Sequence, residues 1–304
     1  MKKPKVDERA AWLEARKAGV GSSEAAAILG VHPFLTALDV FNLKTGRAEE
    51  TDHEEMSEAM EAGTRLEGAV AEWFADRSGL LVVDPGPFQL VKSKRGPFVA
   101  TPDRYIVDPA NPAKGRGILE VKTTHAMKAK EWRDEPPLWS QVQLQHQFGV
   151  VEDVTWGIVC VLIGGQALRY SSAIDRNPKF VAALQEQEPV FWAHVAKDDP
   201  PPYDPLRDAE ALQRLYPADD GSLVRLPSSL RAVDDEIESL KGERARIARE
   251  IEIRENRIRA ALREAAAGVL PGGIVWSWKT QERAEHVVKA SSFRTLRRRQ
   301  PKAN

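Results

Sequence analysis

The distribution of apolar and polar positions predicts a mixed α/β core in the N-terminal part of the chain. Short apolar runs bounded by turn residues predict strands, and apolar residues repeating every three or four positions predict helices. In chain order, the expected elements are a helix from Thr64 to Gly79, strands within 80–91, 98–107 and 117–124, a helix at 138–148, a hairpin at 154–173 and a helix at 178–195. This order, α-β-β-β-α-β, indicates a central mixed sheet flanked by helices.

Residues that typically begin helices occur at several positions. Ser22 or Ser23 is suited to the N-cap of a short helix that Gly30 ends, because a serine hydroxyl accepts a hydrogen bond from an unpaired N–H. Residues 36–39 (Thr-Ala-Leu-Asp) resemble a capping box and predict another helix start. Residues 64–67 (Thr-Arg-Leu-Glu) form a complete capping box, which predicts that the next helix begins there.

The composition changes after the proline-rich segment 199–205, which predicts a stiff linker. We therefore expect two parts, a core domain at residues 1–205 and an extension at residues 206–304. Apolar residues of the extension form one seam, which predicts a long, coiled-coil-like helix that packs against another helix. The seam consists of Leu230, Val233, Ile237, Leu240, Ile247, Ile251, Ile258 and Leu262, and Arg244 and Arg254 interrupt it. A short β segment at 273–279 and a basic tail follow.

The composition is that of a soluble protein: 304 residues, 29% of them charged, and a formal net charge of −1. The single cysteine, Cys160, lies in an apolar run and is expected in the core. One cysteine excludes a disulfide framework, a cysteine zinc site and a cysteine-bound iron–sulfur cluster. No apolar run approaches the roughly 20 residues that a membrane-spanning helix needs. We therefore expect a cytoplasmic protein without a membrane partner.

Two charged residues interrupt the apolar strand predicted at residues 117–124. Side chains alternate between the faces of a strand, so Glu120 and Lys122 point the same way. Asp103 stands at the head of the preceding apolar run, and the loop between allows the two strands to lie side by side. Two carboxylates offer hard oxygen ligands to Mg²⁺, and the ammonium can position a water or neutralise developing charge. The alternative is a surface hairpin with one exposed salt bridge.

The acidic residues match the PD-(D/E)xK nuclease pattern, and residues 8–200 resemble the phage lambda-type exonucleases and the YqaJ-like viral recombinase nucleases. Five motifs occur in the order of those families. They are Trp12-x-x-x-Arg16 followed by Gly21-Ser22-Ser23-Glu24, then Gly63 to Glu67, Thr101-Pro102-Asp103, Leu119 to Lys122, and Ser140 to Gln143. The resemblance implies a restriction-endonuclease-like core, which is a mixed α+β fold with a central mixed sheet flanked by helices.

The resemblance also implies an activity and a set of site residues. The activity is metal-dependent exonucleolytic digestion of double-stranded DNA from the 5′ end, which leaves a 3′ single strand for a single-strand-annealing recombinase. The implied catalytic residues are Asp103, Glu120, Lys122 and Gln143. The implied ligands of Mg²⁺, for which Mn²⁺ can substitute, are Glu67, Asp103, Glu120 and the Val121 carbonyl. The implied DNA or phosphate contacts are Arg16, Ser22, Ser23 and Gln141.

Other interpretations remain open at this stage. Glu67 is either a metal ligand or the glutamate of a capping box, Ser23 is either a phosphate contact or a helix cap, and Arg16 and Gln143 are either site residues or surface residues. The lambda-type enzymes form ring-shaped trimers, but the C-terminal third departs from smaller members, so the homo-oligomeric state stays open. The alternative functions are an endonuclease or a CRISPR-associated type of nuclease on the same core, and a non-catalytic DNA-binding scaffold protein.

Overall fold

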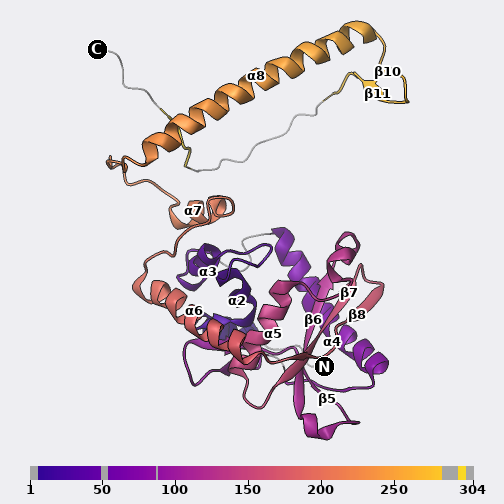
Figure 1. The fold of residues 1–304 in the computed structure, drawn as a ribbon, viewed down its shortest axis with the longest axis vertical. Helices are drawn as coiled ribbons and strands as arrows, with labels where there is room; N and C mark the ends of the chain where they lie inside the picture. The colour runs from indigo at the N-terminus through magenta and orange to yellow at the C-terminus, as the bar shows by residue number, and fades with distance from the viewer. Residues whose placement is uncertain (1–5, 49–53, 87, 283–293, 299–304) are drawn as a thin grey trace. The chain divides into compact units, whose positions relative to one another are not determined.

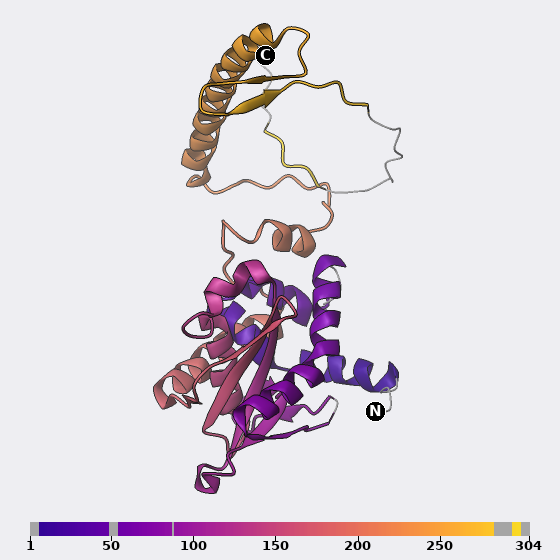
Figure 2. The same ribbon diagram turned by 90° about the vertical axis from the view of Figure 1, so that its right-hand side faces the viewer.

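The computed structural model divides the chain into two compact units, residues 1–217 and residues 218–304 (Figures 1 and 2). The stretches that the structure describes are residues 6–48, 54–86, 88–282 and 294–298. Within these stretches, no helix has both the length and the apolar character to cross a membrane.

A mixed sheet forms the centre of the first unit. Its strands lie in the order β2-β5-β6-β7-β8, and β9 also pairs with β7. They are β2 (Leu81–Val83), β5 (Arg104–Val107), β6 (Arg116–Thr124), β7 (Trp156–Ile163), β8 (Ala167–Tyr170) and β9 (Ile174–Asp175). Only the central pair, β6 and β7, is parallel among the described pairs of this sheet. A smaller sheet contains β1 (Val20–Gly21), β4 (Phe98–Ala100) and β3 (Val91–Lys92).

Helices cover both faces of the central sheet (Figure 1). Those of the first unit are α1 (Val6–Lys17), α2 (Ser22–Ile28), α3 (Ala37–Lys44), α4 (Glu54–Ser78), α5 (Leu138–Val150), α6 (Pro178–Lys197) and α7 (Ala209–Leu215), with short 3₁₀ helices at Pro112–Lys114 and Ala126–Trp132. On one face, Phe74 of α4 shares an apolar cluster with Leu119 of β6. On the other, Leu144 of α5 shares a cluster with Ile118 of β6. Adjacent β6 residues thus face opposite layers, and the predicted mixed α/β core is confirmed.

The apolar run at 98–107 contains two strands rather than the one predicted. Thr101, Pro102 and Asp103 separate β4 from β5, and the two strands belong to different sheets. A proline has no N–H to donate to a strand ladder, so the run cannot continue through Pro102. The pairing of β5 with β6 begins at Arg104 opposite Leu119. The part of β6 beyond this pair is therefore open to the side chain of Asp103.

The cap of α2 differs from the prediction, whereas the cap of α3 agrees with it. Helix α2 has Gly21 as its N-cap, so neither Ser22 nor Ser23 occupies that position. The Gly21 N–H donates to a carboxylate oxygen of Glu24 at 2.7 Å, so an acidic side chain satisfies this donor. At α3, the expected capping box forms, with the Asp39 N–H donating to Thr36 Oγ1 at 3.1 Å.

The predicted start of α4 is wrong. The helix begins at Glu54, so Thr64 and Glu67 lie in its interior and form no capping box. Thr64 Oγ1 instead donates to the Met60 carbonyl, one turn earlier, at 3.0 Å. The acidic residues before Thr64 extend the helix, since exposed charged residues at helical positions are compatible with it. Glu67 is consequently available for a contact outside its own helix.

The first unit extends beyond residue 205, the boundary predicted from the proline-rich segment. Helix α7 packs on α3, where Asn42 Nδ2 donates to the Ala211 carbonyl at 2.9 Å. Arg214 lies 3.3 Å from a carboxylate oxygen of Asp39, and Leu215 is buried. The prolines thus join two parts of one unit rather than separating two units.

The second unit consists of a long helix, α8 (Leu230–Leu262), and a hairpin of β10 (Ala267–Val269) and β11 (Val275–Ser277). Helix α8 ends at Leu262, a few residues before the glycines at 268–273. Of the predicted basic tail, Arg298 pairs with Asp234 of α8 at 2.7 Å. The remaining tail residues at 283–293 and 299–304 lie outside the described residues.

Candidate active site

A buried glutamate forms the centre of the candidate site. Glu120 lies on β6 facing α5, and it is only 1% exposed. Gln143 Nε2 donates to one oxygen of its carboxylate at 2.5 Å, and Gln147 Nε2 donates to the other at 2.7 Å. The two glutamines are four residues apart in α5 and therefore lie on the same helix face. A buried carboxylate needs such donors, because an unpaired charge in the interior is costly.

Lys122 lies on the same face of β6 and completes the set of donors to Glu120. Its Nζ is 2.6 Å from Glu120 Oε1 and 2.9 Å from Gln143 Oε1. Burial alone would lower the pKa of Lys122, but the carboxylates of Glu120 and Asp103 raise it above its usual value. The side chain therefore stays an ammonium ion at neutral pH, and it acts as a donor of hydrogen bonds and of positive charge.

Asp103 occupies the place where a strand partner of β6 would otherwise lie. Its Oδ2 accepts the Val121 N–H at 2.7 Å, just beyond the last residue pair of β5 with β6. Burial raises the pKa of the Asp103 carboxyl well above its usual value, and the nearby carboxylates of Glu120 and Glu67 raise it further. The sequence prediction that Asp103 lies near Glu120 and Lys122 is thus confirmed by these contacts.

Glu67 reaches the same region from α4. Arg104 Nη1 donates to Glu67 Oε1 at 2.5 Å, and the same guanidinium nitrogen also donates to the Asp103 carbonyl. Burial raises the pKa of Glu67 against the opposing effect of Arg104, and Glu120 contributes to the rise. Arg104 therefore connects Glu67 to the loop that carries Asp103.

The three carboxylates repel one another across a partly buried site, and a divalent cation would relieve this repulsion. No group of three or more His, Cys, Asp or Glu side chains is arranged to bind a metal ion in the described part of the chain. An ion held here would therefore need other oxygen ligands as well, such as the Val121 carbonyl and water. Mg²⁺ commonly retains several waters, so the donor set fits this ion.

The N-terminal motif is connected to the loop that carries Asp103. Trp12 Nε1 donates to Thr101 Oγ1 at 3.2 Å, and the Arg16 guanidinium lies over the Trp12 ring, 4.6 Å from its centroid. The Arg16 carbonyl accepts from Lys44 Nζ at 2.9 Å, and Lys44 also pairs with the buried Glu24 at 2.8 Å. These contacts fix the backbone of Arg16 relative to Thr101.

The other predicted phosphate contacts have different surroundings. Ser22 is buried, and its Oγ has no hydrogen-bond partner among the described residues, whereas Ser23 is half-buried. Gln141 Nε2 donates to the Pro136 carbonyl at 2.6 Å, at the start of α5. The structure therefore gives Gln141 a contact that stabilises its own helix start.

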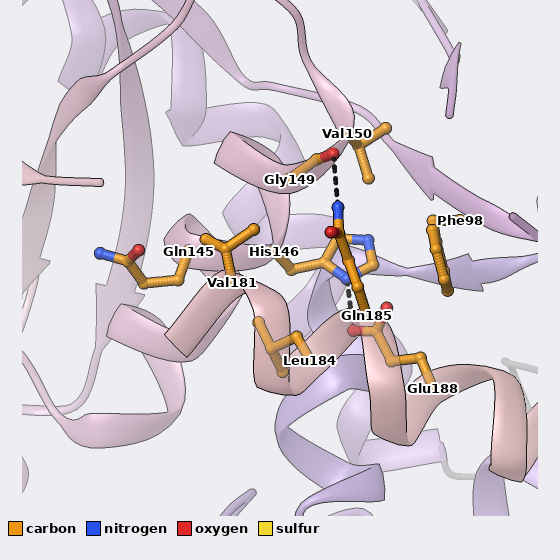
Figure 3. A pocket seen from close by; sticks show the side chains of 9 residues that line it. All are labelled: Phe98, Gln145, His146, Gly149, Val150, Val181, Leu184, Gln185 and Glu188. Atoms are coloured by element: carbon orange, nitrogen blue, oxygen red, sulfur yellow. Dashed lines mark hydrogen bonds and ion pairs between the residues drawn. The ribbon is translucent and has the colours of Figure 1, made fainter. Parts of the chain in front are cut away.

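The sequence did not identify a second buried charge pair on α5. His146 Nδ1 lies 2.7 Å from Glu188 of α6, and its Nε2 donates to the Val99 carbonyl of β4 at 3.1 Å. Burial alone would lower the pKa of His146, but Glu188 raises it above its usual value. Figure 3 shows the two side chains pointing toward each other beside a small pocket. Asp103, Glu120 and Lys122 do not line this pocket, so it belongs to the packing of α5 against α6.

Comparison with known families gives one match over the region that contains the site. The family model of the YqaJ-like viral recombinase domain matches residues 11–153, which include the three carboxylates, Lys122 and the glutamines of α5. The uncharacterized protein YqaJ of Bacillus subtilis is 29% identical over 273 residues, which span 88% of this chain and 82% of that protein.

Two solved structures are also similar. One is an alkaline exonuclease, LHK-Exo, from Laribacter hongkongensis, with 17% identity, a TM-score of 0.47 and coverage of 62% of this chain and 94% of that chain. The other is LHK-Exo in complex with dAMP, with 18% identity, a TM-score of 0.47 and coverage of 68% and 97%. At these identities and scores, the similarity does not assign roles to residues of this chain.

The repulsion among the carboxylates predicts that Asp103→Asn stabilises the metal-free protein. A carboxyl whose pKa is raised on folding holds its proton more tightly in the folded state, so its ionisation opposes folding. Asparagine keeps an oxygen for the Val121 N–H and removes the charge. In EDTA at pH 8, we expect the variant to have the higher Tm, by roughly 2–4 °C for each kcal/mol of repulsion removed.

Thermal unfolding of both proteins from pH 8 to pH 4 checks this prediction. The difference in Tm should shrink as the pH falls toward about 4, the ordinary pKa of an aspartate, because Asp103 is then protonated in the unfolded as well as in the folded wild type. Asp134→Asn, which neutralises an exposed carboxylate, should leave Tm within about 1 °C at every pH. A lower Tm for Asp103→Asn at pH 8 would show that Asp103 is not under repulsive strain.

Proposed function

The domain at residues 11–153 belongs to the YqaJ-like viral recombinase family, and from this membership we propose that the protein is a metal-dependent nuclease that degrades double-stranded DNA from its ends. The observation that carries the proposal is the contact of Asp103 with β6 beside Glu120 and Lys122. Two carboxylates and an ammonium are thus close together on and beside β6, the middle strand of the central sheet. Such a set suits phosphodiester hydrolysis, which needs a metal site and a donor for developing charge.

In this proposal, Asp103, Glu120, Glu67 and the Val121 carbonyl hold the ion, which is Mg²⁺ or, as a substitute, Mn²⁺. The bound ion supplies a water of lowered pKa and stabilises negative charge on the phosphate. Burial is the main cause of the raised pKa values of Asp103 and Glu67, and the carboxylate of Glu120 adds to both. A bound cation would offset both effects, which supports this assignment. Gln143 and Gln147 hold the Glu120 carboxylate in one orientation from α5.

Lys122 acts as a donor in this site rather than as a base. Its raised pKa keeps it protonated at neutral pH, and two of the three N–H groups of its ammonium bond Glu120 and Gln143. The third can orient the attacking water or stabilise charge on the phosphate. A proton released by that water is therefore accepted by a carboxylate or by solvent, and not by Lys122.

We assign recognition of the DNA end to the N-terminal motif. A guanidinium can donate two parallel hydrogen bonds to a terminal phosphate, which makes Arg16 the main contact. Ser22, Ser23 and Gln141 would provide further polar contacts. The bond from Trp12 to Thr101 supports the proposal, because it connects this motif to the loop that carries Asp103. The direction that we propose is 5′ to 3′, with the remaining 3′ strand passed to a single-strand-annealing recombinase.

Digestion of end-labelled linear duplex with Mg²⁺ tests the proposed activity. We expect the 5′ label to be lost first, and we expect covalently closed circular DNA of the same sequence to remain intact. Glu120→Gln and Asp103→Asn should each lower the rate at least about a hundredfold, because each removes a ligand charge from the site. Asp134→Asn is the matched control and should keep the wild-type rate.

A lower rate of digestion by Asp103→Asn cannot result from unfolding, because this variant is expected to have a higher Tm than the wild type. Undiminished digestion by either variant, or in EDTA, would contradict the assignment of the site. Cleavage of closed circular DNA would instead show that the protein is an endonuclease on the same core.

A second experiment tests the role of Arg16 with duplexes that carry either a 5′-phosphate or a 5′-hydroxyl. We expect Arg16→Ala to slow digestion of the phosphorylated duplex at least about tenfold, which corresponds to one lost charge-assisted contact. The ratio of the digestion rates on the 5′-phosphate and 5′-hydroxyl duplexes should fall accordingly. Arg16→Lys should restore the rate only in part, since an ammonium cannot form two parallel bonds. Arg9→Ala, in the same helix, is the control, and an unchanged preference in Arg16→Ala would rule out this role.

A further inference from the structure

Helix α8 exposes most of its apolar seam within the described part of its own unit, and only Ile258 and Leu262 at its C-terminal end are half-buried. The helix has 33 residues, and none of them is buried. Six apolar side chains of the seam are each 42–64% exposed: Leu230, Val233, Ile237, Leu240, Ile247 and Ile251. A single helix of this kind gains little stability from its own hydrogen bonds, because most helical stability in proteins comes from packing an apolar face. The seam is therefore an interaction surface.

The spacing of the seam is that of a heptad repeat. With Leu230 at position a, every a and d position up to residue 261 is apolar except Arg244 and Arg254. The a positions are Leu230, Ile237, Arg244, Ile251 and Ile258, and the d positions are Val233, Leu240, Ile247, Arg254 and Ala261. A strict repeat of seven keeps one seam in contact with a neighbouring helix along its whole length, which is about 50 Å here. The surface thus fits another long helix.

We propose that this helix is α8 of a second copy of the chain, paired in parallel and in register as a two-stranded coiled coil. In this arrangement, each apolar layer meets the same layer of the partner over the full length of α8. Mixed Ile, Leu and Val layers interrupted by single charged layers favour two strands over three, since a charged layer is accommodated best where it can reach solvent. The proposal concerns assembly and does not depend on nuclease activity.

One of the two charged pairs beside the seam is attractive in the parallel pairing. Glu236 at position g faces Lys241 at position e of the second copy, which gives two attractive pairs across the dimer. Each seam arginine has an acidic neighbour at the flank, Glu243 beside Arg244 and Glu255 beside Arg254. A guanidinium in one copy can therefore reach a carboxylate of the other.

The pairing also places Glu250 opposite Glu255 of the second copy, which is repulsive. Within the helix, however, Glu250 pairs with Arg254 at 2.5 Å and Glu255 pairs with Arg259 at 2.6 Å. Each of these pairs places a positive charge beside one of the two carboxylates, which weakens the repulsion between them. Arg298, for its part, binds Asp234 and Glu238, which lie at positions e and b outside the seam.

Sedimentation of the full chain at several concentrations tests the proposal, with a matched pair of variants. We expect a dimer in the wild type. Ile247→Asp, in the seam, should raise the dimer dissociation constant at least about a hundredfold, because it places two facing carboxylates in an apolar layer. Ile253→Asp makes the same substitution at position c, where the side chain is 46% exposed against 47% for Ile247, and it should leave the dimer intact. A wild-type monomer or trimer, or equal effects of the two variants, would overturn the proposal.

Two further variants distinguish an effect on helix pairing from a loss of folding, and they determine whether the paired helices are parallel. Arg244→Ile fills a charged layer, so it should tighten the dimer at least about tenfold. Leu240→Cys at position d should form a disulfide between copies under mild oxidation, because identical d positions meet only in a parallel, in-register pair; the native Cys160 is buried and cannot compete. Absence of the cross-link in an intact dimer, or a weaker dimer in Arg244→Ile, would contradict the proposed arrangement.

Discussion

The burial of the Glu120 carboxylate is the constraint on which the rest of the site depends. A negative charge at the centre of a parallel strand pair is tolerated only with donors around it. Gln143, Gln147 and Lys122 provide these donors, so α5 must lie with one polar face against an otherwise apolar sheet. The need to surround the buried Glu120 carboxylate with donors thus determines which side chains make up the site.

Helix α5 also connects Glu120 to Asp103. Another buried polar side chain of α5, His146, is held by Glu188 and donates to the Val99 carbonyl of β4. Strand β4 ends two residues before Pro102, so the same helix that orients Glu120 also fixes the start of the Asp103 loop. Helix α5 thus contacts both Glu120 and the strand that leads into the Asp103 loop, and the Val121 N–H binds Asp103 directly.

Much of the candidate site could be predicted from the sequence, because the positions of its residues depend on local periodicity. The alternation along β6 predicted the shared face of Glu120 and Lys122, and the loop length predicted that Asp103 lies nearby. The start of α4 could not be predicted, since Thr64 and Glu67 have the spacing of a capping box and are equally compatible with a helix interior. The sequence did not distinguish Gln147 from its neighbouring glutamines, because the position of β6 determines which face of α5 meets Glu120. The packing of α7 on α3 could not be predicted, because the residues in contact are far apart in sequence.

The central claim is that the mutually repelling carboxylates near Glu120 form a divalent-metal site. The most direct measurement is anomalous diffraction at the manganese edge from crystals of the wild-type protein grown with Mn²⁺. We expect an anomalous peak within about 2.5 Å of an Asp103 carboxylate oxygen and the Val121 carbonyl, and no such peak in crystals of Asp103→Asn. A fully ordered site without a peak at saturating Mn²⁺, or a peak elsewhere in the chain alone, would contradict it.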